Sequence, residues 1–421
     1  MATVTRSVRE VCEEAKAASH VLAWAGREAK DACLKDLAER LEGRSAELLE
    51  ANRADLEAGR EEGLNDALID RLTLTEERIS EMAAGVREIA GLEDPVGELV
   101  ESWTLENGLR VRKERVPIGV VAIVYEARPN VTIDAAALCL KSGNAAVLRG
   151  SSSAETSNAF LAGLVREALA AAELPEAATC LLEGGGHEQL RELATQEGLV
   201  DLIIPRGGEG LKRALKEVAK VPVMYAAAGN CHVYVHEDAD LSMAQRIAYN
   251  AKVQRPGVCN SAETLLVHRK VASALLPAAI QELADAGVEL VGDERTRENA
   301  GSVRVGVATP EDWDTEYLGM KMAIAVVDSL AKAIEHINTH GTGHSEAIVT
   351  SSEEAAEGFT GGVDAAAVYV NASTRFTDGY EFGMGAEIGN STQKLHARGP
   401  IGLRELTTTK YIVHGSGQIR E

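Results

Sequence analysis

Apolar residues recur every three or four positions in the first part of the chain. From Val4 to about Leu92 the sequence is charged and rich in alanine, which with this spacing predicts a series of amphipathic surface helices. Between Leu99 and Val116 two alternating runs flank Asn107-Gly108, the dipeptide most typical of a short hairpin turn. An isolated hairpin is only marginally stable in water, so we expect this arm to pack on another surface, such as a second subunit.

From Gly119 onward β-rich runs alternate with helical segments. GVVAIVYE, AAVLRG, TCLLEGG and VDLIIPRGG have the composition of strands, and amphipathic segments separate them. This alternation predicts a parallel, doubly wound α/β sheet, whose ligands bind at the carboxyl ends of the strands. A second α/β stretch is expected from His232 to about Asn371, and the late run ELTTTKYIVHG predicts one more strand.

Length and charge narrow the class of protein. A chain of 421 residues favours two to three domains, and its 45% apolar content argues against disorder. The formal net charge of −22 argues against a nucleic-acid partner, because binding phosphates requires a surplus of Lys and Arg. Any anionic ligand must therefore be held by locally placed cations and backbone amides.

The sequence also predicts where the protein works. Its six cysteines are scattered without a C-x-x-C pair, which is typical of free thiols in a reducing compartment. The first residues lack the basic and apolar regions of a signal peptide, and no window approaches the roughly 18 to 20 apolar residues of a membrane span. We expect a soluble, cytoplasmic protein with no membrane partner.

Cys259 differs in context from the other cysteines. It lies in QRPGVCNSAE, on a Pro-Gly turn before the apolar run TLLVH, with Arg255 four residues before it. Nucleophiles are common at such loop ends, but the spacing alone leaves an inert thiol equally open. A catalytic Cys259 would need nearby positive charge, since a thiol with a pKa of about 8.5 is mostly protonated at neutral pH. Four others, placed among Ala and Leu in regular segments, are expected to be buried: Cys12, Cys33, Cys139 and Cys180.

Glycine-rich segments are present, but the G-x-G-x-x-G fingerprint is absent. Gly207-Gly208-Glu209-Gly210 lies between a predicted strand and a predicted helix, where free amides and the helix dipole favour phosphate. A plain tight turn is the alternative, as it is for Gly184–Gly186 and Gly383–Gly385. The chain has no G-x-S-x-G elbow and no Walker loop, which excludes the usual serine hydrolases and nucleotide kinases.

Three histidines fall at helical spacing. His336, His340 and His344 are four residues apart, which would align three metal ligands on one helix. Gly341-Thr342-Gly343 ends any helix before the third, and no carboxylate motif accompanies them. We expect solvated or turn-capping histidines and no metal site.

Four long blocks stand in order along the chain: VPIGVVAIVYEARPNVTIDAAALCLKSGNAAVLRGS, RPGVCNSAETLLVH, HINTHGTGHSEAIVT and GAEIGNSTQKLHARGPIGLRELTTTKYIV. They resemble the glutamate-5-semialdehyde dehydrogenase (gamma-glutamyl phosphate reductase) family of the aldehyde dehydrogenase superfamily. The resemblance covers essentially the whole chain and implies an aldehyde dehydrogenase-like α/β fold. Its implied parts are a Rossmann-type cofactor domain (1–98 and 119–231), a second α/β catalytic domain (232–371), and an oligomerisation arm with the C-terminal segment (99–118 and 372–421).

The resemblance implies the chemistry. Members of the family reduce L-glutamate 5-phosphate with NADPH to L-glutamate 5-semialdehyde and phosphate, the second step of L-proline biosynthesis, which implies a functional link to glutamate 5-kinase. The family's nucleophile matches Cys259, whose thiolate would displace phosphate and form a thioester. Asn130, in RPNV, matches the oxyanion donor and would work with the backbone amide of Cys259.

The resemblance also implies a cofactor site. Arg149 replaces the superfamily's ribose-contacting lysine, and Ser152 aligns with the glutamate of NAD-preferring relatives. A small neutral side chain beside an arginine favours the 2′-phosphate of NADPH. The remaining matches are Gly150 and Ser151 beside Arg149, Arg206, Gly207 and Gly208 in the pyrophosphate loop, and Glu316 for the nicotinamide ribose.

The anionic substrate and the subunit contacts need further residues. Candidate substrate-binding cations are Arg128, Lys141, Lys394 and Arg398, with ordinary surface or interface cations as the alternative. The hairpin and the C-terminal strand match the superfamily's oligomerisation arm, which implies a homo-oligomer, either a dimer or a dimer of dimers.

One segment departs from hydrolytic relatives. Tyr225-Ala226-Ala227-Ala228-Gly229-Asn230 stands where those enzymes carry a glutamate general base. A reductase should lack that base, because activated water would hydrolyse its thioester. Other functions stay open: a CoA-acylating or hydrolytic aldehyde dehydrogenase, a nicotinamide-free thiol acyltransferase using Cys259 and Asn130, or a scaffold that kept only the fold.

Overall fold

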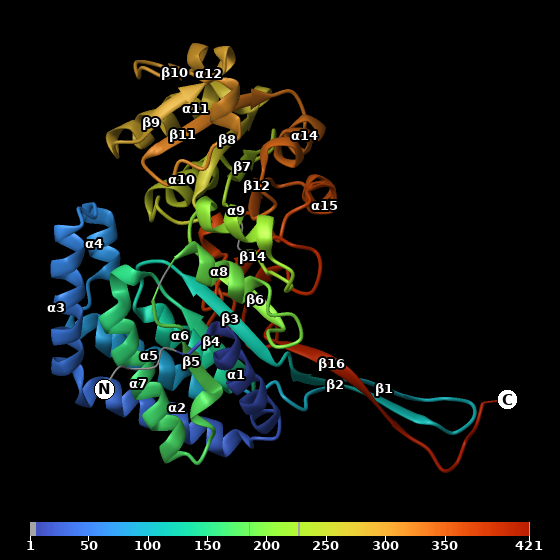
Figure 1. The fold of residues 1–421 in the computed structure, drawn as a ribbon. Coiled ribbons are helices and arrows are strands. Elements are labelled where there is room, and N and C mark those ends of the chain that lie inside the picture. Colours follow the sequence, from blue (N-terminus) through green and yellow to red (C-terminus); the bar gives the residue numbers. More distant parts are fainter. Residues whose placement is uncertain (1–5, 185, 226–227, 421) are drawn as a thin grey trace. The chain divides into compact units, whose positions relative to one another are not determined.

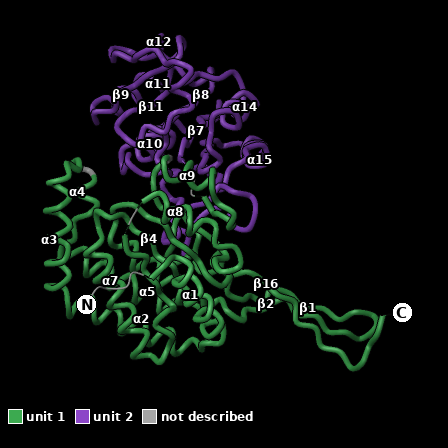
Figure 2. Tube along the Cα trace, viewed as in Figure 1, with its two compact units in different colours: residues 1–225, 384–389, 401–421 green, residues 226–383, 390–400 purple. Residues whose placement is uncertain are grey.

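The computed structural model describes residues 6–184, 186–225 and 228–420. These residues form two compact units (Figure 2). Unit 1 comprises residues 1–225, 384–389 and 401–421, and unit 2 comprises residues 226–383 and 390–400. The C-terminal part of the chain therefore contributes to both units, and the residues of the expected arm and C-terminal segment are divided between them.

The N-terminal region is helical, as its periodicity predicts. Its helices are α1 (Val8–Leu22), α2 (Arg27–Gly43), α3 (Ser45–Glu61), α4 (Asp66–Leu72) and α5 (Glu76–Gly91). A capping box between Ser7 and Glu10 starts α1, and the Thr75 side chain caps α5. Their buried positions, such as Leu34, Leu37 and Leu41 of α2, follow the helical repeat.

A parallel sheet with the strand order β5-β4-β3-β6 forms the centre of unit 1. Its strands are β3 (Val120–Tyr125), β4 (Ala145–Arg149), β5 (Thr179–Leu181) and β6 (Leu202–Arg206). The accompanying helices are α6 (Asn130–Lys141), η1 (Ser152–Ala154), α7 (Glu155–Ala171), η2 (Glu176–Ala178), α8 (His187–Ala194) and α9 (Glu209–Val218). The predicted doubly wound arrangement is confirmed. The order reverses between β3 and β6, and ligands bind at the carboxyl ends of strands beside such a reversal.

The predicted hairpin and C-terminal strand form one antiparallel arm. It consists of β1 (Leu99–Thr104), β2 (Arg110–Pro117) and β16 (Thr407–His414), with β2 between the other two. Pairing of β16 runs along the whole of β2, from Thr407 opposite Pro117 to His414 opposite Arg110. Figures 1 and 2 show these strands as a long ribbon extending from the rest of unit 1.

Unit 2 is built on a second parallel sheet, with the order β10-β9-β11-β8-β7-β12-β13. Its strands are β7 (Cys231–Val235), β8 (Ala262–His268), β9 (Glu289–Gly292), β10 (Gly306–Val307), β11 (Lys321–Val327), β12 (Ser345–Val349) and β13 (Ala367–Val370). Its helices are α10 (Leu241–Val253), α11 (Arg269–Asp285), α12 (Glu294–Glu298), α13 (Pro310–Trp313), α14 (Leu330–His340), α15 (Glu353–Gly362) and η3 (Thr374–Phe376). A short pair, β14 (Asn390–Ser391) with β15 (Gly399–Pro400), completes the unit.

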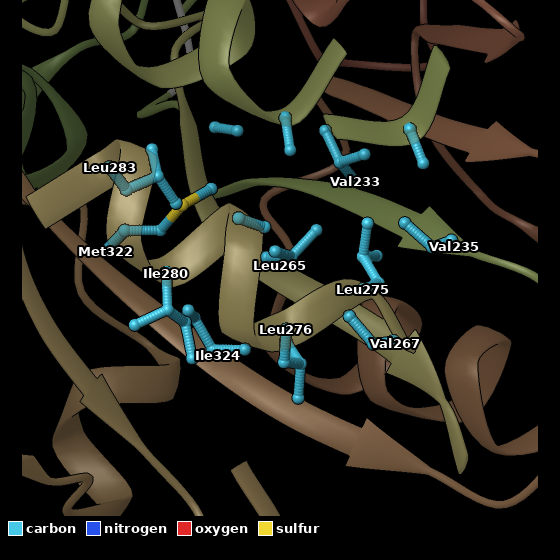
Figure 3. Close-up of a cluster of buried hydrophobic side chains, with 14 of the residues drawn as sticks. Val233, Val235, Leu265, Val267, Leu275, Leu276, Ile280, Leu283, Met322 and Ile324 are labelled. Atoms are coloured by element: carbon cyan, nitrogen blue, oxygen red, sulfur yellow. The ribbon is translucent and has the colours of Figure 1, made fainter. Parts of the chain in front are cut away.

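The core of unit 2 holds its central strands in place. Figure 3 shows Leu276 and Ile280 of α11 beside Ile324 of β11 and Val267 of β8. Burying each such side chain stabilises the fold by about 1.5 to 3 kcal/mol. The loops at the ends of β7, β8 and β11 therefore start from a firmly packed sheet.

Two further features concern the whole chain: the state of its cysteines and the character of its helices. The cysteines, all within the described residues, are free; Cys259 is half-buried and the others are buried, as predicted for four of them. Across the described ranges, no helix combines the length and the apolar character needed to cross a membrane.

Candidate active site

Cys259 lies on a turn directly before β8, at the amino end of the unit 2 sheet. Because the neighbouring strands are parallel, the loops that precede β7, β11 and β12 reach the same edge. The backbone carbonyl of Cys259 accepts a hydrogen bond from Cys231 Sγ at 3.2 Å, at the start of β7. The thiol is thus placed on a loop end supported by two buried strands.

Gly229 joins Cys259 to Glu316. A Cβ atom at position 229 would lie 1.4 Å from the carbonyl oxygen of Cys259, so no larger residue fits without moving the turn. The Gly229 N–H donates a hydrogen bond to Glu316 Oε1 at 2.7 Å. The structure therefore brings two predicted site residues to one edge of unit 2.

The segment Tyr225–Asn230 is described only in part. Ala226 and Ala227 lie outside the described residues. Asn230 is buried, and its Nδ2 donates to the carbonyl oxygens of Trp313 at 2.6 Å and His340 at 2.8 Å. These bonds fix the backbone directly after Gly229.

A buried ion pair supports the loop that carries Glu316. Glu263 Oε2 pairs with Lys252 Nζ at 2.5 Å, and both side chains are fully buried. Glu263 Oε1 accepts a hydrogen bond from the Leu318 N–H at 3.3 Å. Burial raises the pKa of Glu263 to about 7, against the opposing effect of Lys252. Glu263, the second residue of β8, therefore also anchors the Glu316 loop.

Arg375 is a residue that sequence reasoning missed. Its Nε donates to Gln254 Oε1 at 2.8 Å, and its carbonyl accepts from Nδ2 of Asn260, the neighbour of Cys259, at 3.2 Å. Its Nη1 is buried and has no hydrogen-bond partner among the described residues. Burial lowers the pKa of Arg375, Arg255 lowers it further, and Cys259 raises it, so these groups lie within electrostatic range. The sequence indicated only that a catalytic Cys259 would need a nearby cation. It did not indicate which residue supplies that cation.

In unit 1, Asn130 is the first residue of α6 and follows the carboxyl end of β3. Its Nδ2 donates to Asp134 Oδ2 at 3.0 Å, which uses one of the two N–H groups of the amide. Burial raises the pKa of Asp134 to about 6, although the bond from Asn130 and the charge of Arg206 oppose the shift. Asp134 therefore fixes the orientation of the Asn130 amide.

Arg149 ends β4, beside the tight turn at Gly150. Its Nη2 donates to the Gly186 carbonyl at 2.8 Å, while its Nε is buried and lacks a partner within the described part of the chain. Burial lowers the pKa of this guanidinium. A Cβ at Gly150 would lie 2.2 Å from Asn158 Nδ2, so the turn requires glycine. Ser151 caps η1, which begins with the exposed Ser152.

The predicted pyrophosphate loop lies at the carboxyl end of β6, at the strand-order reversal. Arg206 ends β6, and Gly208 is the N-cap of α9. The Gly208 N–H donates to Glu126 Oε1 at 3.2 Å, and a Cβ at Gly207 would meet the same carboxylate at 2.8 Å. An incoming phosphate would have to displace Glu126, a residue that the sequence did not single out. With that displacement, the loop and the unpartnered Arg149 Nε fit a dinucleotide phosphate.

Two of the predicted substrate cations belong to unit 1. Lys141 is fully buried: its Nζ pairs with Asp31 at 2.5 Å and donates to the Ala90 carbonyl at 2.8 Å. We therefore correct its expected role to a structural one, because its ammonium is enclosed and already bonded. Arg128 is exposed in the loop between β3 and α6.

The other two cations belong to unit 2. Lys394 and Arg398 both pair with Asp364, at 2.5 and 2.7 Å, in the loop before β13. With Thr342 and Glu346 they line a cavity of about 400 Å³. In the strand order β13 is three positions from β8, roughly 14 Å at the usual strand spacing. The described contacts do not bring either cation to Cys259.

The helix ends where its glycines predict, but the expectation of solvated or turn-capping histidines is wrong for His344, which is fully buried with its Nδ1 2.7 Å from Ser345 Oγ. Helix α14 ends at His340 and Gly341 is its C-cap, so His344 lies beyond the helix. The rings of His336 and His340 are 4.6 Å apart. No group of three His, Cys, Asp or Glu side chains within the described ranges is arranged to hold a metal ion.

Comparison with known proteins agrees with the fold. A model of the aldehyde dehydrogenase family matches residues 2–302. Gamma-glutamyl phosphate reductase of Moorella thermoacetica is 55% identical, over 99% of this chain and 100% of the relative. The enzyme of that name from Thermobifida fusca is 53% identical over the full length of both chains. The crystal structure of gamma-glutamyl phosphate reductase from Thermotoga maritima superposes with a TM-score of 0.96 at 48% identity, covering 99% of this chain and 100% of that one.

Proposed function

The chain belongs to the aldehyde dehydrogenase family, and we propose that it reduces L-glutamate 5-phosphate with NADPH to L-glutamate 5-semialdehyde and phosphate. This is the reaction of a gamma-glutamyl phosphate reductase, the second step of L-proline biosynthesis. The observation that carries the proposal is identity of 53 to 55% along essentially the full chain with enzymes of that name. The grouping of Cys259, Gly229 and Glu316 at one sheet edge supports it.

Cys259 performs the first chemical step. Its thiolate attacks the acyl carbon, a C–S bond forms, and the C–O bond to phosphate breaks with its electron pair leaving on phosphate. The oxyanion that develops is stabilised by the Asn130 amide and the backbone N–H of Cys259. Asp134 supports this role because it holds the Asn130 amide in one orientation.

The nicotinamide cofactor supplies a hydride to the thioester carbon when it is bound. Glu316 would hold the nicotinamide ribose, and Arg206, Gly207 and Gly208 would receive the pyrophosphate. Arg149, with its buried unpartnered Nε, would bind the 2′-phosphate beside Gly150, Ser151 and Ser152, which favours NADPH over NADH.

Water must be kept from reacting at the same carbon. The segment from Tyr225 to Asn230 contains no carboxylate in sequence, and the Gly229 N–H holds the nearby Glu316 carboxylate. A carboxylate that accepts this bond is directed to the loop backbone, which supports reduction of the thioester by hydride, or acyl transfer to phosphate, over hydrolysis.

The proposal extends to the protein's surroundings. The arm of β1, β2 and β16 would join copies of the chain in a dimer or a dimer of dimers. The enzyme would work in the cytoplasm, where glutamate 5-kinase would supply its acyl phosphate.

The reverse reaction tests the proposed function. Purified protein is mixed with L-glutamate 5-semialdehyde, NADP⁺ and phosphate, and NADPH formation is followed by absorbance. We expect a signal that requires phosphate and is abolished in Cys259→Ser. Absence of a phosphate-dependent signal in the wild type would overturn the function, and an active Cys259→Ser variant would overturn the nucleophile.

A further inference from the structure

The proposed reaction places a doubly negative phosphate beside Cys259. In an acyl phosphate, one oxygen joins the phosphorus to the carbon that the thiolate attacks, so the phosphate lies within a few bonds of Sγ. The chain as a whole carries a formal charge of −22 and does not attract this group. A local cation is needed at the amino end of β8.

No described contact places the cations predicted from sequence in unit 2 beside Cys259. Lys394 and Arg398 are paired with Asp364 before β13, away from the Cys259 turn. Arg255 lies on the turn itself, but its side chain is exposed. Arg375 differs from all three because it is partly enclosed and bonded to both sides of that turn.

Two hydrogen bonds hold Arg375 against the segment that carries the nucleophile. Gln254, before the turn, accepts from Nε at 2.8 Å, which fixes the plane of the guanidinium. Asn260, directly after Cys259, donates to the Arg375 carbonyl at 3.2 Å. The Thr374 hydroxyl donates to the Asn260 carbonyl at 2.7 Å, which completes a bracket around the cysteine.

The guanidinium has unused donor capacity. Its Nη1 is buried and has no partner among the described residues, an arrangement that is destabilising unless a ligand completes it. A guanidinium presents parallel N–H groups that match two oxygens of a phosphate. The orphaned Nη1 is therefore an unused donor for an anion, on a residue that is bonded to both sides of the Cys259 turn.

We propose that Arg375 binds the phosphate group of the acyl phosphate and holds it as the leaving group. This inference rests on the proposed function and deepens it. In the forward direction, Arg375 stabilises the charge that phosphate gains when the C–O bond breaks. In the reverse direction, it positions inorganic phosphate to attack the thioester on Cys259, with the electron pair returning to sulfur.

The α-carboxylate of the substrate is the competing ligand for Arg375. It lies at the opposite end of the glutamyl chain from the attacked carbon. The reverse reaction separates the two groups, since inorganic phosphate and the semialdehyde, which carries the α-carboxylate, are added as different reactants.

The test compares wild type, Arg375→Gln and Arg375→Lys in the reverse reaction. Arg246→Gln is the matched control, because Arg246 is an exposed arginine of the same unit bonded to Ser242. We expect the KM for phosphate to rise about 10- to 100-fold in Arg375→Gln. The rise should be smaller in Arg375→Lys, because lysine keeps the positive charge but lacks the parallel N–H donors of a guanidinium. The KM for the semialdehyde and the Kd for NADP⁺ should stay within about twofold, as a group bonded only to phosphate predicts.

A second assay keeps the result independent of folding. The burst of nitrophenolate from p-nitrophenyl acetate measures acylation of Cys259 without phosphate, and Arg375→Gln should retain it. A raised KM for the semialdehyde with an unchanged KM for phosphate would assign Arg375 to the α-carboxylate and overturn the proposal. Loss of the burst in both Arg375 variants would overturn it too, because it would show that Arg375 is needed for the reactivity of the Cys259 thiol rather than for binding phosphate. If the wild type shows no phosphate-dependent reaction, the proposed function fails instead.

Discussion

Gly229 sets how closely two loops of the candidate site approach each other. It lies so close to the Cys259 carbonyl that no Cβ fits there, and its N–H donates to the Glu316 carboxylate. The approach to Cys259 depends on the absence of a side chain, because the nearest atom is backbone and cannot rotate away. A single methyl group at this position therefore tests the geometry of the site.

We predict that Gly229→Ala displaces the Cys259 turn and lowers the rate of cysteine acylation at least about tenfold, with a loss of stability of about 1 to 3 kcal/mol. The nitrophenolate burst from p-nitrophenyl acetate and thermal unfolding measure the two effects. Gly361→Ala is the control, since a Cβ in that helical position meets nothing within 4 Å and should be neutral or stabilising. An unchanged acylation rate in Gly229→Ala would contradict the close approach of the two loops.

Asn130 supplies the second prediction at this scale. Removing an oxyanion donor costs roughly 2.7 to 4 kcal/mol of transition-state stabilisation, so Asn130→Ala should lose about 10² to 10³ in kcat. Steady-state kinetics with saturating cofactor measures the change, and the Kd of the cofactor should be unaffected. Turnover near the wild-type value would remove Asn130 from the mechanism.

At the residue scale, sequence reasoning singled out residues that stand in a local motif. The turn before an apolar run marked Cys259, and the resemblance marked Glu316, which the structure links to it through Gly229. Arg375 stands in no such motif, because only the bonds to Gln254 and Asn260 bring it to the turn. Lys141 had the right charge, but nothing in its local sequence shows that Asp31 and the Ala90 carbonyl enclose it.

At the scale of elements, the pair Lys252–Glu263 joins α10 to β8 and reaches the Glu316 loop through Leu318. Removing one partner of a buried pair leaves an uncompensated charge, whereas replacing both is often tolerated. The pair therefore offers a test that separates packing from charge.

Lys252→Met should destabilise unit 2 by about 3 to 5 kcal/mol at neutral pH, and the double variant Lys252→Met/Glu263→Gln should recover most of that loss. Glu263 already has a pKa raised above its unfolded value, and loss of Lys252 raises it further. The folded single variant then binds the additional proton, so its stability should fall as pH rises from about 5 to 8. Urea unfolding across this range measures it, and a flat pH profile would contradict the account.

The sequence predicted which types of element occur along the chain, but not which edge of each sheet carries the candidate site. Apolar runs predicted the four strands of the unit 1 sheet, and Asn107-Gly108 predicted the hairpin between β1 and β2. For unit 2 the sequence predicted an α/β stretch as a whole, with only the run TLLVH of β8 singled out. The expectation that ligands lie at carboxyl strand ends suits Arg149 and Arg206 in unit 1. In unit 2, Cys259 and Glu316 lie before their strands, at the amino ends, and no periodicity shows which edge of a sheet carries chemistry.

At the scale of the whole molecule, the arm of β1, β2 and β16 is the feature that indicates contact with a second chain. Tyr411 and Val413 on β16 lie on the same face of the strand and are 60% and 53% exposed. Tyr411 also packs edge-on against Trp103 of β1, with ring centroids 6.1 Å apart. Exposed apolar side chains on an edge strand are typical of a surface that pairs with another chain.

We predict that the wild-type protein is an oligomer and that the double change Tyr411→Glu and Val413→Glu reduces it to a single chain. Light scattering coupled to size exclusion measures the mass. Thr408→Glu, on the opposite face of β16, is the control and should keep the wild-type mass. A double variant of unchanged mass would show that this face does not join the subunits.

The central claim is that Cys259 carries a γ-glutamyl thioester that phosphate, not water, discharges. The most direct measurement is a chase: enzyme is mixed with L-glutamate 5-semialdehyde and NADP⁺ without phosphate, and samples are quenched in acid for mass spectrometry of the Cys259 peptide. We predict an adduct of one glutamyl group that persists in buffer and disappears on addition of phosphate. An adduct that decays equally fast without phosphate, or one found on a residue other than Cys259, would contradict the account.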